Sequence, residues 1–145
     1  MRSLYRGFNK SLSLNVQTNF FHYVPRVPRE TDLCVHNHAD AWFLKHFNIR
    51  ARSSTVICST DFSQARSYGS TYRITPSEPF IIIYSPMVKD FLEHQAELSS
   101  TSREDVWAWL ERKQYVSVEK VEDVASDFFG EVMVCCTSFL VEPYV

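Results

Sequence analysis

The stretch from Arg52 to Pro86 constrains the fold of this chain more than any other segment. Its residue pattern predicts four short elements, namely a strand over 55–58, a helix over 62–68, a strand over 70–75 and a strand over 80–84. Asp61 is a typical N-cap for this helix, and Gly69 is a typical stop. Strands that enclose one short helix predict a domain that contains both helix and sheet.

The rest of the chain places strands near both ends and helices between them. Further strands are predicted over 3–8, within 9–19, over 115–118, and over 131–135 and 138–141, the last two as a hairpin. Further helices are predicted after Asn37 as N-cap, from Ser85-Pro86, and after Thr101, which forms a capping-box pattern with Glu104. The segment from Tyr23 to Thr31 contains two prolines and predicts an extended loop. This order favours a single α+β domain over residues 1–145 with a mostly antiparallel sheet.

Composition narrows the classes of function. The chain has only three glycines, so neither GxGxxG nor GxxxxGK[ST] occurs, and a Rossmann or P-loop nucleotide site is not expected. A net charge of −2 disfavours a protein that binds duplex DNA mainly through its phosphates. The four cysteines form no CxxC pair and are expected to be reduced thiols in a cytoplasmic protein. No apolar run approaches the ~18 residues of a transmembrane helix, so no membrane partner is expected.

Three polar features stand at the ends of predicted strands. Arg6 follows Leu4-Tyr5, Ser59-Thr60 follows the strand over 55–58, and Glu131 begins the strand over 131–135. A guanidinium group supplies a planar fork of donors for phosphate. A serine hydroxyl can both donate and accept, which suits an amide or a ribose. A carboxylate can bind a ribose hydroxyl or stabilise developing positive charge.

The residues at these strand ends resemble those of the ADP-ribosyltransferase fold. The resemblance consists of Tyr5-Arg6-Gly7, then Ser59-Thr60 followed by Ala65 and Tyr68, and then Glu131-Val132-Met133-Val134. It implies a mostly antiparallel split sheet or β-sandwich with flanking helices. It also implies NAD as a substrate and an unidentified protein or nucleic acid as the acceptor of ADP-ribose. The middle of the chain is similar to small phage and viral proteins related to this fold, which implies action in a host cytoplasm.

The resemblance assigns a role to each matching position. It implies that Arg6 holds the diphosphate or the adjoining ribose of NAD, that Ser59 braces the nicotinamide ribose, and that Thr60 supports the loop. Glu131 is the implied catalytic residue, because it would bind the 2′-hydroxyl of the nicotinamide ribose and stabilise an oxocarbenium-like transition state.

Two aromatic residues complete the predicted NAD site. Tyr68 is the implied stacking partner of nicotinamide, and Tyr72 is a second candidate for the wall of the same pocket. The prediction is therefore geometric: Arg6, Ser59 and Glu131 should converge on one cleft with Tyr68 or Tyr72 on its wall. Packing of Tyr68 in the core is the competing interpretation.

Two positions depart from the family pattern. Residue 61 is Asp, so the triplet is Ser-Thr-Asp and not Ser-Thr-Ser, and residue 129 is Phe, so no Glu-x-Glu pair exists. These departures leave open a different acceptor, hydrolysis of NAD, or a catalytically inactive module of the same fold that binds a protein or a nucleotide.

Other polar groups admit alternative interpretations. The spacing of His36 and His38 is found in some metal sites, but it runs directly into a predicted helix, and no metal is expected. Arg26, Arg29, Arg50 and Arg52 favour solvated arginines around a proline loop, with a phosphate-binding patch as the alternative. An RNA-processing member of the fold remains a third possibility, although the acidic total disfavours it.

Overall fold

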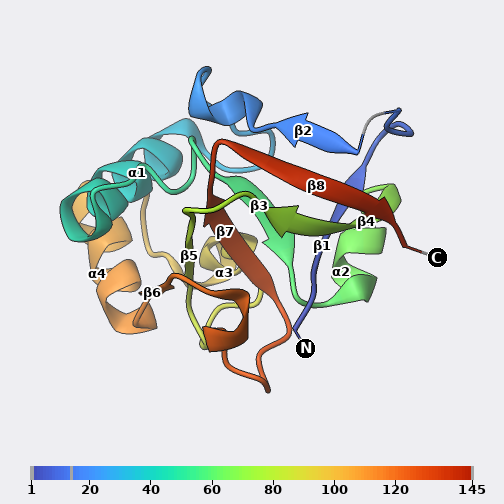
Figure 1. Cartoon of the computed structure of the whole chain (residues 1–145). Coiled ribbons are helices and arrows are strands. Elements are labelled where there is room, and N and C mark those ends of the chain that lie inside the picture. The colour runs from blue at the N-terminus through green and yellow to red at the C-terminus, as the bar shows by residue number, and fades with distance from the viewer. Residues whose placement is uncertain (1, 14, 145) are drawn as a thin grey trace.

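The computed structural model describes residues 2–13 and 15–144, and the described part forms one antiparallel sheet flanked by helices (Figure 1). The strands are β1 (Leu4–Phe8), β2 (Val16–Thr18), β3 (Val56–Ser59), β4 (Ser70–Pro76), β5 (Ile81–Tyr84), β6 (Val116–Val118), β7 (Glu131–Cys135) and β8 (Ser138–Pro143). The helices are α1 (Leu33–Phe47), α2 (Phe62–Arg66), α3 (His94–Glu97) and α4 (Arg103–Lys113), with 3₁₀ turns η1 (Phe20–His22), η2 (Phe91–Glu93) and η3 (Val121–Asp123). The strand order is β2-β8-β4-β1-β3-β7-β5-β6. The predicted α+β class with an antiparallel sheet is confirmed.

The sheet opens at its centre, between β1 and β3. β1 pairs with β4 over its whole length, from Leu4 to Phe8, but it pairs with β3 only at Tyr5 and Ser59. That single pair joins the two halves into one hydrogen-bonded sheet, whereas a split sheet or sandwich was expected. Beyond Tyr5, β1 and β3 diverge, and the space between them is available for side chains.

Each face of the sheet carries its own apolar core. On β3, Val56 and Cys58 point into one core while Ile57 packs against the other, as the two-residue period of a strand requires. The second core includes Phe43 of α1 and Trp109 of α4, two helices that lie side by side. Ser59 follows Ile57 by two residues and therefore projects on the face that α1 covers. The same alternation places Glu131 on that face, two residues before Met133.

The predicted hairpin of the last two strands is wrong. β7 lies between β3 and β5, and β8 lies between β2 and β4, so the two strands are not neighbours. The buried Asn19 explains where the chain turns away. Its side chain donates to the carbonyl of Cys136 at 2.8 Å and its backbone N–H donates to that of Thr137 at 2.8 Å. These bonds bring the link between β7 and β8 to the segment after β2.

The predicted start of α1 is also wrong. The helix begins at Leu33, because Asp32 caps it by accepting from the N–H of Cys34 at 2.8 Å, and Asn37 lies inside it. Similarly, α4 is capped by Ser102 rather than Thr101, through a bond from the N–H of Asp105.

No helix begins at Ser85-Pro86. The Ser85 hydroxyl accepts from the N–H of Met87 at 3.0 Å, and Ser85 bridges to Val88, which makes a turn. Helical structure starts only after Asp90, which forms a capping box with Glu93.

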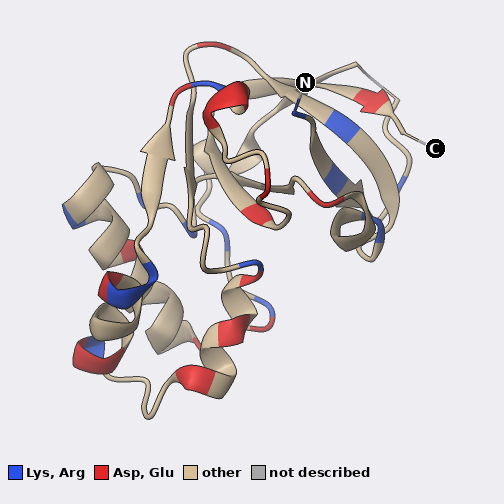
Figure 2. Ribbon diagram, turned by 90° about the horizontal axis from the view of Figure 1, so that it is seen from below, with Lys and Arg blue, Asp and Glu red and all other residues tan. Residues whose placement is uncertain are grey.

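Charges of both signs are distributed along the helices and loops rather than gathered on one basic face (Figure 2). In the described segments, no helix is both long enough and apolar enough to cross a membrane. The four cysteines are free thiols, of which Cys58 and Cys136 are buried.

Candidate functional site

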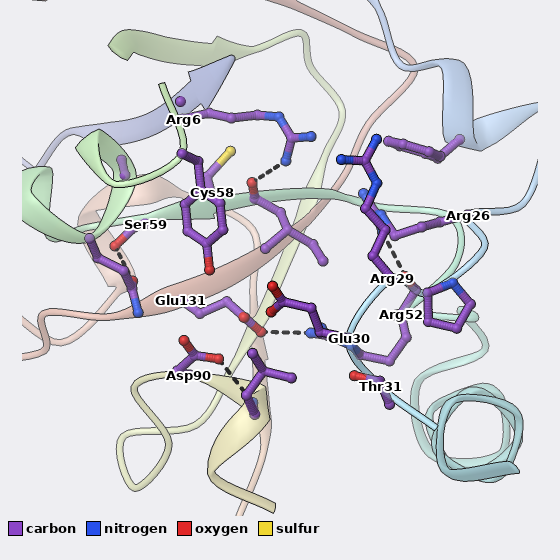
Figure 3. Close-up of a pocket in the computed structure, with 18 of the residues that line it drawn as sticks. Arg6, Arg26, Arg29, Glu30, Thr31, Arg52, Cys58, Ser59, Asp90 and Glu131 are labelled. Atoms are coloured by element: carbon purple, nitrogen blue, oxygen red, sulfur yellow. Dashed lines mark hydrogen bonds and ion pairs between the residues drawn. The ribbon is translucent and has the colours of Figure 1, made fainter. Parts of the chain in front are cut away.

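A cleft of about 520 Å³ lies on the face of the sheet that carries Ser59 and Glu131. It is bounded by the divergence of β1 from β3, by α2, and by the loop that follows η1 (Figure 3). Its lining includes Arg6, Ser59, Tyr68, Glu131, Arg26 and Arg52. The predicted convergence of Arg6, Ser59 and Glu131, with Tyr68 on the wall, is therefore present.

Register in the sheet explains why Ser59 and Glu131 meet. Ser59 pairs with Tyr5 of β1 on one side and with Glu131 of β7 on the other. Directly paired residues project on the same face of an antiparallel sheet. Tyr5, Ser59 and Glu131 therefore form one row of side chains at the floor of the cleft, although their strands are far apart in the sequence.

Ser59 is a positioning residue for α2. Its hydroxyl donates to Gln64 Oε1 at 2.5 Å and accepts from the N–H of Asp61 at 2.9 Å. Asp61 in turn caps α2 by accepting from Ser63, as predicted. The hydroxyl thus ties the end of β3 to the first turn of the helix that leads to Tyr68.

Glu131 does not project freely into the cleft. Its Oε1 forms an ion pair with Arg52 Nη1 at 2.6 Å, with side-chain exposures of 15% for Glu131 and 11% for Arg52. The guanidinium group of Arg52 also lies over the ring of Phe91, with 4.1 Å between Cζ and the ring centroid. A charge-assisted bond of this length holds the carboxylate in one orientation.

Arg6 enters the cleft from the divergent end of β1. Its Nη1 donates to the carbonyl of Ile57 at 2.5 Å, a group of β3 that β1 does not pair with. Burial lowers the pKa of the Arg6 guanidinium below its ordinary value. A guanidinium group remains protonated in proteins, so Arg6 is a half-buried positive charge.

Arg26 is a cleft residue that the sequence interpretation placed in solvent. Its guanidinium group donates to the carbonyls of Arg52 at 2.6 Å and Thr55 at 2.7 Å, and it lies over the ring of Phe21. The pKa of Arg26 is lowered to about 9. Burial is the main cause, and the positive charges of Arg6 and Arg52 contribute to the same shift. The interpretation of solvated arginines is therefore wrong for Arg26 and Arg52, which are partly buried and line the cleft, whereas Arg50 is exposed.

Tyr68 presents its ring to the cleft and to solvent. The residue is 57% exposed, so the competing interpretation of a core tyrosine is wrong. Burial of the hydroxyl raises its pKa, and the nearby carboxylates of Asp90, Glu131 and Glu30 raise it further. Glu30 and Asp90 also line the cleft, and no motif in the sequence pointed to them.

Two predicted residues lie outside the cleft lining. Thr60 is buried, and its hydroxyl donates to the carbonyl of Phe128 at 2.9 Å and accepts from the N–H of Gly130 at 3.0 Å. It therefore supports the loop before Glu131, as the resemblance implied. Tyr72 does not form a wall, because its ring packs in the core against Phe8 and its hydroxyl accepts from the N–H of Leu12.

His36 is a further group at the cleft. Its Nε2 lies 3.7 Å from Asp40 Oδ2, one turn along α1. The other oxygen of Asp40 accepts from the backbone N–H groups of Arg52 and Ser53. Burial lowers the pKa of His36, the carboxylate of Asp40 opposes this shift, and the charges of Arg52 and Arg26 add to it. Within the described segments, no group of three metal-ligating side chains is found.

Comparison with known proteins gives no relative: no protein-family model, curated protein or solved structure matches this chain. The chemistry of the cleft must therefore be argued from its own groups. In the described part of the chain, neither Arg6 nor Arg26 forms an ion pair with a carboxylate. Arg52 has one carboxylate partner. The cleft thus combines two arginines that form no ion pair among the described residues, a carboxylate that is ion-paired with Arg52, and the exposed ring of Tyr68.

Proposed function

We propose that this cleft binds NAD and that Glu131 assists the transfer of ADP-ribose from NAD to an acceptor. The observation that carries the proposal is the convergence of Arg6, Ser59 and Glu131 on one cleft. The three residues come from β1, β3 and β7, and the resemblance to ADP-ribosyltransferases selects the same three. Their convergence supports an ADP-ribosyltransferase-like fold for the chain.

The charges of the cleft support a ligand with a diphosphate. Arg6 and Arg26 are half-buried guanidinium groups that bond only to backbone carbonyls among the described residues. The two positive charges repel each other, as the lowering of the Arg26 pKa by Arg6 indicates. Two phosphate groups, each carrying one negative charge, relieve this repulsion and accept bonds from the planar donor forks.

The remaining groups match the other parts of NAD. The exposed ring of Tyr68 offers a stacking surface for nicotinamide. When the bond between ribose C1′ and the nicotinamide nitrogen breaks, nicotinamide leaves with the electron pair and positive charge develops on the ribose. A carboxylate held in place before the reaction stabilises that charge without reorganising, which is the role proposed for Glu131. The acceptor oxygen, nitrogen or water then bonds to C1′ and loses its proton.

A catalytically inactive module that binds a nucleotide or a protein is the second candidate. One observation favours it, namely the 2.6 Å ion pair that engages Glu131 with Arg52. A carboxylate that stays in this pair gives less stabilisation to a developing positive charge. Both candidates share nucleotide binding, and they differ in whether nicotinamide is released.

The test is to incubate the full chain with nicotinamide-labelled NAD and to measure released nicotinamide. The variants are Glu131→Gln and the matched control Glu142→Gln, which removes an exposed carboxylate paired with Arg73 on β4. Release by the wild type and the control, with a loss of about 100-fold or more in Glu131→Gln, is the expected result. Equal release by all three proteins would refute the catalytic role of Glu131. Binding of NAD without release would favour the second candidate.

A further inference from the structure

We infer that Arg52 belongs to an arginine site for a diphosphate and that the Glu131 carboxylate takes the place of this anion in the free protein. A diphosphate that binds there takes Arg52 away from Glu131. This inference rests on the proposed function, because it takes the diphosphate to be that of NAD. It goes further in assigning Arg52 to ligand binding and in coupling that binding to the release of the Glu131 carboxylate.

The backbone of Arg52 is anchored while its head group faces the cleft. The backbone N–H donates to Asp40 Oδ1 at 2.8 Å, and the carbonyl accepts from Arg26 Nη1 at 2.6 Å. The guanidinium group rests on the ring of Phe91, and its Nη1 approaches Met133 Sδ at 3.4 Å as well as Glu131. Among the described residues, Glu131 is the one carboxylate that pairs with it. Because the planar guanidinium group lies on the Phe91 ring, it can slide over that ring without losing contact with it. Arg52 can therefore exchange Glu131 for another anion.

Three guanidinium groups share this part of the cleft. Arg26 lies within electrostatic reach of both Arg6 and Arg52, as the lowered pKa of Arg26 indicates. Figure 3 places Arg6 on one side, Arg26 and Arg52 on the other, and Glu131 at the end of the Arg52 side chain. The carboxylates of Glu131 and Asp40 act on these three positive charges, and Asp40 is held by the backbone N–H groups of Arg52 and Ser53. The positive charges still outnumber these carboxylates, and a diphosphate brings the negative charge that can neutralise the excess.

The other charged groups of the cleft do not supply this compensation. Arg29 and Glu30 are exposed, where solvent and salt weaken their interactions. Asp90 is engaged as the cap of η2, where it accepts from the N–H of Leu92. The partly buried pair of Arg52 and Glu131 is therefore the contact that a ligand phosphate must open.

The consequence is a requirement for the diphosphate in the substrate. A diphosphate that bonds to Arg52 frees the Glu131 carboxylate to meet the ribose of the same ligand. Nicotinamide riboside, which lacks phosphate, leaves the ion pair closed. We expect it to be cleaved at least tenfold more slowly than NAD, because it forms no charge-assisted bond to Arg52 and leaves Glu131 in its ion pair.

The test uses inorganic pyrophosphate as the probe and isothermal titration calorimetry on the full chain. Glu131→Gln should bind pyrophosphate about tenfold more tightly than the wild type, because no carboxylate then competes for Arg52. The control Glu142→Gln removes the same charge far from the cleft and should bind as the wild type does. Arg52→Gln should bind at least tenfold more weakly. Unchanged or weaker binding by Glu131→Gln would overturn the inference.

A second measurement does not depend on the folding of any variant. In the wild-type protein, the side-chain N–H resonances of Arg52 should shift when pyrophosphate is added, and those of Arg73 should not. No shift at Arg52 under saturating pyrophosphate would overturn the inference. Tighter pyrophosphate binding by Glu131→Gln without nicotinamide release by the wild type would leave the anion site in place and refute the proposed function alone.

Discussion

Replacement of Gly7 by alanine tests the close approach on which the cleft wall depends. Gly7 follows Arg6 on β1, and α2 crosses directly over it. A Cβ atom at position 7 would lie 2.3 Å from the carbonyl oxygen of Ala65 and 3.0 Å from two atoms of Tyr68. Carbon–oxygen contacts of this kind lie at about 3.3–3.6 Å, so α2 would have to move by roughly 1 Å. Gly7 is a residue of β1, and its lack of a side chain leaves room for α2.

The magnitude is the balance of two opposing effects. An extra methyl group in a packed site costs about 1–3 kcal/mol. The lower entropy of the unfolded alanine chain returns about 0.4–1 kcal/mol. We therefore expect Gly7→Ala to lower the free energy of unfolding by about 1–2 kcal/mol, which lowers Tm by roughly 3–8 °C in a domain of this size.

The assay is urea unfolding followed by tryptophan fluorescence, with Ser117→Ala as the control. Ser117 is an exposed residue of β6, and its replacement should change the free energy of unfolding by less than about 0.5 kcal/mol. Gly7→Ala should also weaken NAD binding, because the displaced segment carries Tyr68. A variant as stable as the wild type, or more stable, would refute the close approach of α2 to β1.

Three further changes test individual parts of the account. Thr60→Val should lower the free energy of unfolding by about 1–3 kcal/mol in a urea titration, because Phe128 and Gly130 lose their hydroxyl partner, while Thr60→Ser should have little effect. Tyr72→Phe should lower the free energy of unfolding by about 1 kcal/mol, because the bond from the N–H of Leu12 is lost. The affinity for NAD in calorimetry should not change, and a large loss of affinity would show that Tyr72 belongs to the NAD site. Burial is the main cause that lowers the pKa values of His36 and His94 in the folded protein. As the pH falls below about 6.5, both residues therefore become protonated more readily in the unfolded chain than in the folded protein. Stability should be fully present above that pH and fall below it, and substitution of both residues by Gln should flatten the dependence.

Local patterns predicted the elements of the sheet because their causes lie within a few residues. Asp61 caps α2 through the second residue after it, and the strand over 80–84 is apolar on both faces because a core lies on each side. The same reasoning missed the partners of β7 and β8. Those partners depend on Asn19, more than a hundred residues earlier in the chain, whose side chain fixes the link between the two strands.

The site was predicted in part for the same reason. Ser59 ends β3 and Glu131 begins β7, where a short motif can mark them, whereas Arg6 lies in the middle of β1. Arg52 precedes β3 in an unremarkable turn, and its role follows only from the ion pair with Glu131, 79 positions away in the sequence. Arg26 lies in a proline-rich loop, and that pattern indicated an exposed side chain. The side chain is instead partly buried, because its guanidinium group donates to the carbonyls of Arg52 and Thr55, which only the fold brings within reach.

The most direct test of the central claim is a crystal structure of Glu131→Gln in complex with NAD. We expect the substitution to slow cleavage, so that the intact dinucleotide can be observed. The account predicts the diphosphate between Arg6 and the pair Arg26 and Arg52, the nicotinamide ring against Tyr68, and the ribose 2′-hydroxyl within hydrogen-bond distance of residue 131. NAD bound elsewhere on the surface, or no NAD in the cleft at millimolar concentration, would contradict the account.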